Sequence, residues 1–153
     1  MKDFIRTGLI VSLMALPAQS ALAFPDIHDT ETGLVKVEQV IDGLNHPWGL
    51  EMLPDGSLLV TERRGKLFLI DPANPSLDRP VANVPQVWAR GQGGLLDVAV
   101  DPNFGEDRTI YLTYSDPGSL GSAGTAIAAA RLEPGAKPAL GDVRTLWSMK
   151  NKT

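Results

Sequence analysis

The chain has 153 residues, no cysteine and a formal net charge of −4 at pH 7. The absence of cysteine excludes disulfide bonds and thiolate metal sites within these residues. The mild acidity, without any basic block, argues against a protein that binds nucleic acid by neutralising its phosphates.

The N-terminus has the layout of a secretory signal peptide, removed from the mature protein. The basic residues Lys2 and Arg6 precede a short apolar run and an Ala-Leu-Ala cleavage site that ends at Ala23. This run is about half of the roughly 20 residues that span a bilayer, which favours a cleaved signal over a membrane anchor. We expect a signal peptide at 1–23 and a periplasmic mature chain at 24–153 without a membrane span.

Beyond the signal, short apolar runs alternate with Pro, Gly, Asp and Asn, which predicts strands rather than helices. Loose alternation indicates a first strand at 35–44. Three further strands, at 48–53, 58–60 and 67–70, are separated by tight turns and predict an antiparallel meander. A fourth strand of this unit is expected at 81–87.

A second unit follows with the same organisation. Its strands are expected at 94–100, 109–114, 125–132 and 143–147. The first strand of each unit ends at a proline turn, at Pro54 and at Pro102. A four-strand unit that repeats after about 48 residues is typical of a β-propeller blade, although a β-sandwich also has short strands and frequent turns.

The chain holds about two and a half such units, whereas a closed propeller needs about four to eight blades. We therefore expect an all-β fold that is the N-terminal fragment of a β-propeller domain at 24–153.

One group of polar residues can be considered as a metal site. Asp101, Asn103 and Asp107 are spaced like the start of a calcium loop, but the terminal bidentate glutamate is absent. These residues are expected to stabilise turns.

Several other polar residues are also expected to be structural. His46 has no neighbouring carboxylate that would orient it as a base. Glu62, Arg63 and Arg64 end a strand, where a local ion pair or support of the hairpin is expected. Arg90 could reach the central channel of a propeller, but a contact with a backbone carbonyl is the favoured expectation.

Three stretches of the chain resemble one enzyme family in their residues, order and spacing, from about residue 35 to residue 149. They are His46-Pro-Trp-Gly-Leu50 with Pro54-Asp-Gly56, Leu59-Val-Thr-Glu-Arg63 with Gly65, and Arg90-Gly-Gln-Gly-Gly-Leu-Leu-Asp97 with Asp101-Pro102 and Phe104. This pattern resembles the glucose/sorbosone dehydrogenase family, and within it the periplasmic aldose sugar dehydrogenases that depend on pyrroloquinoline quinone (PQQ).

The resemblance implies a six-bladed propeller with PQQ over its central channel and calcium beside it. Such an enzyme oxidises the anomeric hydroxyl of an aldose to a lactone. A histidine takes the hydroxyl proton while a hydride moves to the quinone, which calcium polarises and arginines stabilise. The implied partner is an aldose substrate, and the electron acceptor stays open.

The resemblance assigns one cofactor-binding residue within the chain, Gln92. Its amide offers two donors and an acceptor, which suit a quinone oxygen or a sugar hydroxyl; a cap of the glycine-rich turn is the alternative. By resemblance, the catalytic histidine, the arginines and the calcium ligands lie beyond Thr153. We therefore expect no catalytic residue and no metal ligand within these 153 residues, and no activity from them alone.

Two other functions stay open at this stage. One is a non-catalytic propeller module that binds sugar or protein. The other is a propeller lactonase, which would need calcium-binding carboxylates and no quinone. The stretch from Arg90 to Asp97 favours the dehydrogenase over the lactonase, whereas nothing in the sequence separates the dehydrogenase from the binding module.

Overall fold

The computed structural model describes residues 26–152, which form two separate units divided between Gln39 and Val40. The signal peptide predicted at 1–23 lies outside the described residues. The first unit contains a hairpin of β1 (Asp26–Thr30) and β2 (Gly33–Val37). The predicted strand at 35–44 was therefore wrong in its extent. It ends at Val37, and its partner β1 was missed because Asp26–Thr30 is a mostly polar, exposed segment.

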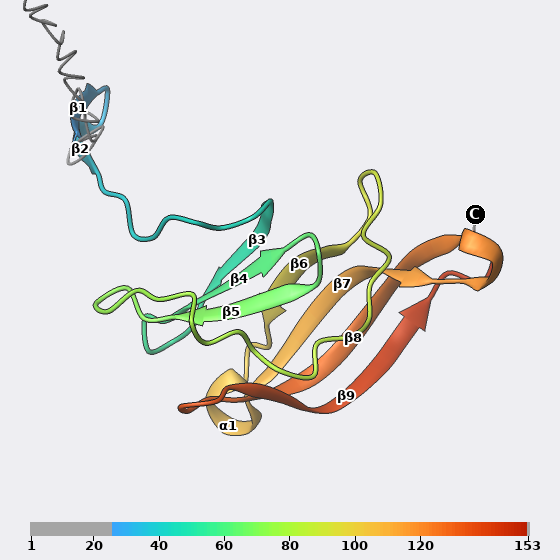
Figure 1. Cartoon of the computed structure of the whole chain (residues 1–153). Coiled ribbons are helices and arrows are strands. Elements are labelled where there is room, and N and C mark those ends of the chain that lie inside the picture. The colour runs from blue at the N-terminus through green and yellow to red at the C-terminus, as the bar shows by residue number, and fades with distance from the viewer. Residues whose placement is uncertain (1–25, 153) are drawn as a thin grey trace, which may run out of the picture. The chain divides into compact units, whose positions relative to one another are not determined.

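The second unit begins with a three-stranded antiparallel sheet (Figure 1). Its strands are β3 (Pro47–Met52), β4 (Leu58–Glu62) and β5 (Lys66–Ile70). The two turns depend on glycines with positive φ, Gly56 at 85° and Gly65 at 99°. Because only glycine adopts such angles without strain, these turns form directly after short strands. The predicted meander is confirmed.

The predicted fourth strand at 81–87 was wrong. Only isolated bridges occur here, between Phe68 and Pro80 and between Ala82 and Ala139. Prolines at positions 80 and 85 remove backbone donors, which prevents a regular ladder. Ala82 instead donates to Pro138 O and accepts from Leu140 N–H, each at 2.9 Å, so the segment is tied to the second sheet.

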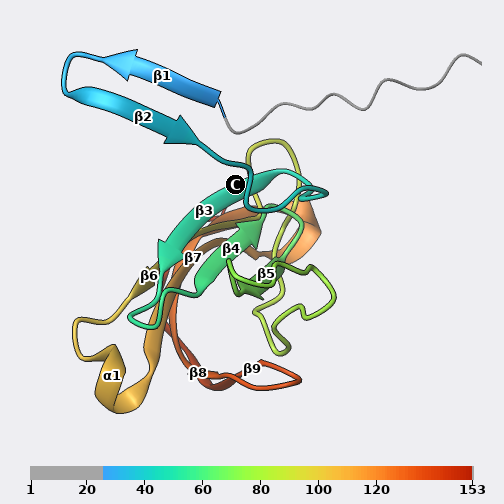
Figure 2. The same ribbon diagram turned by 90° about the vertical axis from the view of Figure 1, so that its left-hand side faces the viewer.

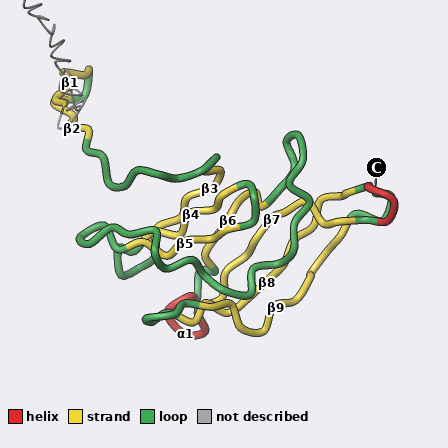
Figure 3. The backbone as a smooth tube through the Cα atoms, viewed as in Figure 1, coloured by secondary structure: helices red, strands yellow, loops and turns green. Residues whose placement is uncertain are grey.

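The second sheet contains the four strands that the sequence predicted, in the antiparallel order β6-β7-β8-β9. They are β6 (Leu95–Val100), β7 (Thr109–Pro117), β8 (Ala123–Glu133) and β9 (Ala139–Ser148). Helical structure among the described residues is confined to the short helix α1 (Phe104–Asp107) and a 3-10 turn, η1 (Ser119–Gly121) (Figure 3). No helix in residues 26–152 is long and apolar enough to cross a membrane.

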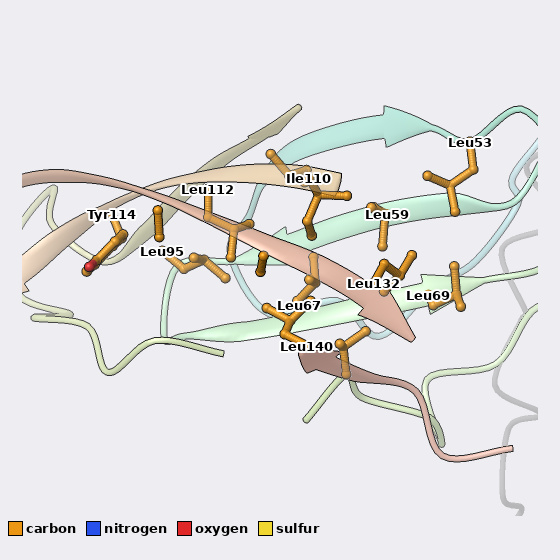
Figure 4. Packing of buried hydrophobic residues seen from close by; sticks show 14 of the residues in the cluster. Leu53, Leu59, Leu67, Leu69, Leu95, Ile110, Leu112, Tyr114, Leu132 and Leu140 are labelled. Carbon is orange, nitrogen blue, oxygen red and sulfur yellow. The ribbon is translucent and has the colours of Figure 1, made fainter. Parts of the chain in front are cut away.

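The two sheets of the second unit pack face to face around the main hydrophobic core (Figure 4). Leu59 and Leu67 from the first sheet are fully buried in it, as are Leu95, Ile110 and Leu112 from the second. Burial of each such side chain contributes about 1.5–3 kcal/mol to folding. This core therefore fixes the sheets against each other, with β3 and β4 against β6.

The first sheet is apolar on its opposite face as well. Leu58, Val60, Phe68 and Ile70 form a second buried cluster there. On β3, the large apolar side chains Trp48, Leu50 and Met52 remain 50–63% exposed. A β-sandwich has polar outer faces, so this sheet with two apolar faces favours the serial stacking of propeller blades.

Candidate functional site

The glycine-rich turn that carries Gln92 lies immediately before β6, at the opposite end of the second sheet from α1 (Figure 2). The turn is closed by a hydrogen bond of 2.8 Å from Gly93 N–H to Arg90 O. Gln92 is exposed, and its side chain has no hydrogen-bond partner in residues 26–152. A turn-capping role for this amide is therefore not supported, and its donors and acceptor are available to a ligand.

Arg63, at the end of β4, connects this turn to the first sheet. Its Nη1 donates to Gly91 O, and its backbone carbonyl accepts the Leu95 N–H at 2.9 Å. Glu62 beside it accepts the Asn45 N–H at 2.6 Å. Glu62 O also accepts the Gly65 N–H at 2.9 Å, which supports the hairpin as predicted. The alternative of a local ion pair is not seen among the described residues.

Arg90 does not contact a backbone carbonyl in the described part of the chain, so that expectation was wrong. Its guanidinium lies over the ring of Trp88, 4.7 Å from the ring centre. Stacking of this kind holds the guanidinium plane in place while its in-plane N–H groups remain available. Trp88 is itself anchored by a backbone hydrogen bond of 2.8 Å to Ser115 O.

A pocket of about 310 Å³ opens beside the Gln92 turn. Its lining includes Trp88, Arg90, Gly93, Ser115 and Thr125. This combination offers a cation, two hydroxyl groups and an aromatic surface next to the exposed amide. Such groups bind polyhydroxylated or anionic molecules through hydrogen bonds and charge.

An ion pair that the sequence analysis missed lies at the margin of this pocket. Lys152 Nζ lies 2.6 Å from Asp116 Oδ2 and donates to Pro117 O at 2.9 Å, and the Ser148 hydroxyl donates to the same carboxylate at 2.8 Å. The hydrogen bond from Lys152, followed by that from Ser148, holds the pKa of Asp116 below its usual value. No local sequence signal links these residues, because strands β8 and β9 separate them.

His46 lies at the start of β3, near the same turn. Its carbonyl accepts the Arg63 N–H at 3.1 Å, and its Nδ1 lies 2.6 Å from Asn45 Oδ1. An amide, rather than a carboxylate, therefore holds the ring. The backbone of His46 is in the left-handed region, with φ of 53°.

The residues spaced like a calcium loop stabilise turns, as predicted. Asp101 Oδ1 accepts the Asn103 N–H at 2.8 Å, and Asp107 Oδ1 accepts the Thr109 N–H at 2.9 Å. The Tyr111 hydroxyl donates to Asp101 Oδ2 at 2.6 Å. This bond, followed by that from the Asn103 N–H, lowers the pKa of Asp101. The same bond to Asp101 raises the pKa of Tyr111. Residues 26–152 contain no cluster of three or more His, Cys, Asp or Glu that would hold a metal ion.

Comparison with known proteins places the chain in a family. The family model described as Glucose / Sorbosone dehydrogenase matches residues 44–153. Aldose sugar dehydrogenase YliI of Escherichia coli is 48% identical over 99 residues, covering 64% of this chain and 26% of that protein. Quinoprotein glucose dehydrogenase B of Acinetobacter calcoaceticus is 31% identical over 122 residues, covering 72% of this chain and 25% of that protein. The chain therefore spans about a quarter of the length of these relatives.

Solved structures show the same likeness. The apo form of the soluble aldose sugar dehydrogenase from Escherichia coli matches with a TM-score of 0.70 and 42% identity, over 75% of this chain and 33% of that one. The PQQ-bound form of aldose sugar dehydrogenase from Streptomyces coelicolor matches with a TM-score of 0.63 and 28% identity, over 74% of this chain and 33% of that one.

Proposed function

The chain belongs to the glucose/sorbosone dehydrogenase family, and on this basis we propose that it supplies propeller blades to a quinoprotein that oxidises aldoses. The proposed reaction converts the anomeric hydroxyl of the sugar to a lactone. Two of the relatives that it matches are named as sugar dehydrogenases, and the all-β architecture is that of their propeller. The observation that carries the proposal is the stretch from Arg90 to Asp97, which presents an exposed Gln92 beside a polar pocket.

The residues around this turn fit one side of a PQQ site. PQQ is a planar quinone with carboxylate groups, so it requires hydrogen-bond donors and cations. Arg90 has no carboxylate partner in residues 26–152, and the buried Nε of Arg63 has no hydrogen-bond partner there. When bound, PQQ supplies the acceptor for the hydride of the sugar. Gln92 would orient a sugar hydroxyl or a quinone oxygen through its amide.

Calcium and the catalytic base belong to the proposal by resemblance alone. The described residues offer no metal cluster. Gln92 cannot accept a proton at neutral pH, and a proton acceptor must lie within hydrogen-bond reach of the reacting hydroxyl. We therefore propose that these 153 residues by themselves do not oxidise sugars, because a base contributes about 10²–10⁴ in rate.

The proposal includes export to the periplasm through cleavage after Ala23. It is supported by the charged start, the short apolar run and the Ala-Leu-Ala site. The mass of the protein isolated from the periplasm should correspond to an N-terminus at Phe24. Recovery of uncleaved protein from the cytoplasm alone would contradict this part of the proposal.

A dye-reduction assay with aldoses, PQQ and calcium tests the activity. A gene product that includes further blades should reduce the dye, and Gln92→Ala in that protein should lower kcat/KM by roughly tenfold or more through poorer orientation of the reacting groups. The 153 residues alone should show no turnover. Sugar binding without dye reduction by the encoded protein would indicate the binding module, and lactone hydrolysis without quinone would indicate the lactonase.

A further inference from the structure

One side chain from the first sheet holds the turn that precedes the second. We propose that Arg63 is the positioning residue of Gln92: it fixes the turn so that the Gln92 amide is presented in a single place. This inference rests on the proposed function only in taking Gln92 as a site residue. The contacts that support it are independent of any cofactor.

Arg63 reaches both ends of the turn. At the first end, the guanidinium Nη1 donates to Gly91 O, next to Gln92 in the chain. At the second end, the backbone carbonyl of Arg63 accepts the Leu95 N–H at 2.9 Å. Gln92 thus lies between two contacts with Arg63, and at the second end the Ser115 N–H also donates to Gly94 O at 2.8 Å.

Arg63 is itself held firmly. Its N–H donates to His46 O at 3.1 Å, so its backbone is bonded to the residue that precedes β3. The preceding residues, Thr61 and Glu62, are buried. A side chain that extends from such a rigid strand end transmits its position to whatever it binds.

The turn has little rigidity of its own. Gly91 and Gly94 have positive φ angles of 54° and 153°, and glycines lose more conformational freedom on ordering than other residues. Within the turn, the hydrogen bond from Gly93 to Arg90 is a single local constraint. Without the contact from Arg63, Gly91 and Gln92 would sample several conformations.

The packing at Gly94 shows how closely the two sheets approach at this point. A Cβ atom placed on Gly94 would overlap the carbonyl oxygen of Arg63 and lie 2.7 Å from its Cγ. Glycine is therefore required for the turn to lie on Arg63. The planar guanidinium suits this narrow space because its donors lie in a fixed fork.

The experiment compares Arg63→Met with Arg64→Met in the protein as its gene encodes it, labelled with ¹⁵N. Arg64 is the adjacent residue of the same type, but it is exposed and has no hydrogen bond or ion pair among the described residues. NMR order parameters of Gly91, Gln92 and Gly93 should fall from about 0.85 to below about 0.6 in Arg63→Met. They should stay unchanged in Arg64→Met, and Arg63→Lys should restore part of the order.

A double-mutant cycle separates positioning from general support of the fold. If Arg63 acts through Gln92, Arg63→Met should lower kcat/KM by roughly tenfold in the parent and have little effect in a Gln92→Ala background. An equal loss in both backgrounds, or unchanged order parameters in Arg63→Met, would overturn the inference. If Arg63→Met does not fold, the same two criteria apply to Arg63→Lys, with a smaller change expected.

Different results would contradict the role of Gln92 in the proposed site and the positioning role of Arg63. A Gln92→Ala variant with full activity would remove Gln92 from the proposed site and end the positioning role in catalysis. The order parameters would still decide whether Arg63 holds the turn. Loss of order without loss of activity would therefore overturn the functional part of the inference, even though the dehydrogenase assignment would stand.

Discussion

Strands β4 and β9 both carry large apolar side chains in antiparallel sheets, but they differ sharply in burial. All five residues of β4 are buried, whereas most of β9 is exposed, including Leu146 at 50% and Trp147 at 51%. The two strands differ in burial because a different number of apolar layers packs against each of them. β4 contacts the main core on one face and the second cluster on the other, whereas within residues 26–152 β9 joins the main core through Leu140, and its residues 142–147 are exposed on both faces. Burial therefore follows from what lies on each side of a sheet rather than from hydrophobicity alone.

This difference matters for the site. The Gln92 turn is held by Arg63, which directly follows β4, the more deeply buried of the two strands. Preorganised groups are most effective when they project from rigid elements. We therefore expect the two strands to differ in their contribution to stability as they differ in burial.

The largest contrast should come from leucine truncation on each strand. Leu59 is fully buried in β4, so Leu59→Ala should lower the free energy of unfolding by about 2–5 kcal/mol through lost burial and a cavity. Leu146→Ala on β9 should change it by less than about 0.5 kcal/mol. Chemical denaturation of both variants measures the difference. Equal losses would show that the outer face of β9 is covered in the protein.

Glycine substitution tests the close approach at the end of β4. Gly94→Ala should cost about 1–3 kcal/mol in strain, with the overlap against Arg63 adding to it. Gly105 in α1 is the matched control, because a Cβ there meets nothing within 4 Å and its φ is ordinary. Gly105→Ala should be neutral or stabilise by up to about 1 kcal/mol. Thermal unfolding of a well-folded Gly94→Ala variant with an unchanged midpoint would contradict the geometry.

A buried hydroxyl on β4 should matter more than an exposed one on β9. The Thr61 hydroxyl accepts the Gly49 N–H at 2.8 Å and donates to Leu96 O at 2.5 Å, and so joins the two sheets. Thr61→Val keeps the shape but leaves both backbone groups without their partner, which should cost about 1–3 kcal/mol. Thr145→Val on β9 removes one hydrogen bond of 3.3 Å to the Tyr114 hydroxyl and should cost less, about 0.5–1.5 kcal/mol. The free energies of unfolding in urea compare the two.

The smallest expected effect is on the free energy of unfolding at low pH. The pKa of Asp116 is lowered in the folded protein by Lys152 and Ser148, so the folded state favours the ionised carboxylate. Its contribution to stability is present above the unfolded pKa of about 3.9 and is lost as the pH falls through the lower folded pKa. The free energy of unfolding should therefore decrease between pH 6 and pH 3 by more in the parent than in Asp116→Asn. Equal decreases would show that this ion pair does not contribute.

Much of the fold could be read from local patterns. The turns at Gly56 and Gly65 and the four strands of the second sheet follow from residues close in the sequence, because a glycine turn and an apolar alternation are local properties. The hairpin strand β1 was missed because it is polar. A fourth strand was wrongly predicted at 81–87 because the segment is rich in apolar residues, although Pro80 precedes it and Pro85 interrupts it.

The candidate site also combines features that local sequence predicts with contacts that only the tertiary structure shows. The sequence by itself determined the strand units, the turn residues and, through the stretch from Arg90 to Asp97, the family and the choice of Gln92. Only the tertiary structure showed that Arg63 binds Gly91 and that Lys152 binds Asp116. These contacts join residues far apart in the chain, and they form because two sheets pack through their apolar faces and bring the ends of their strands together. Local sequence carries the propensity for strands and turns, whereas the partner of a polar side chain depends on which sheet lies beside it.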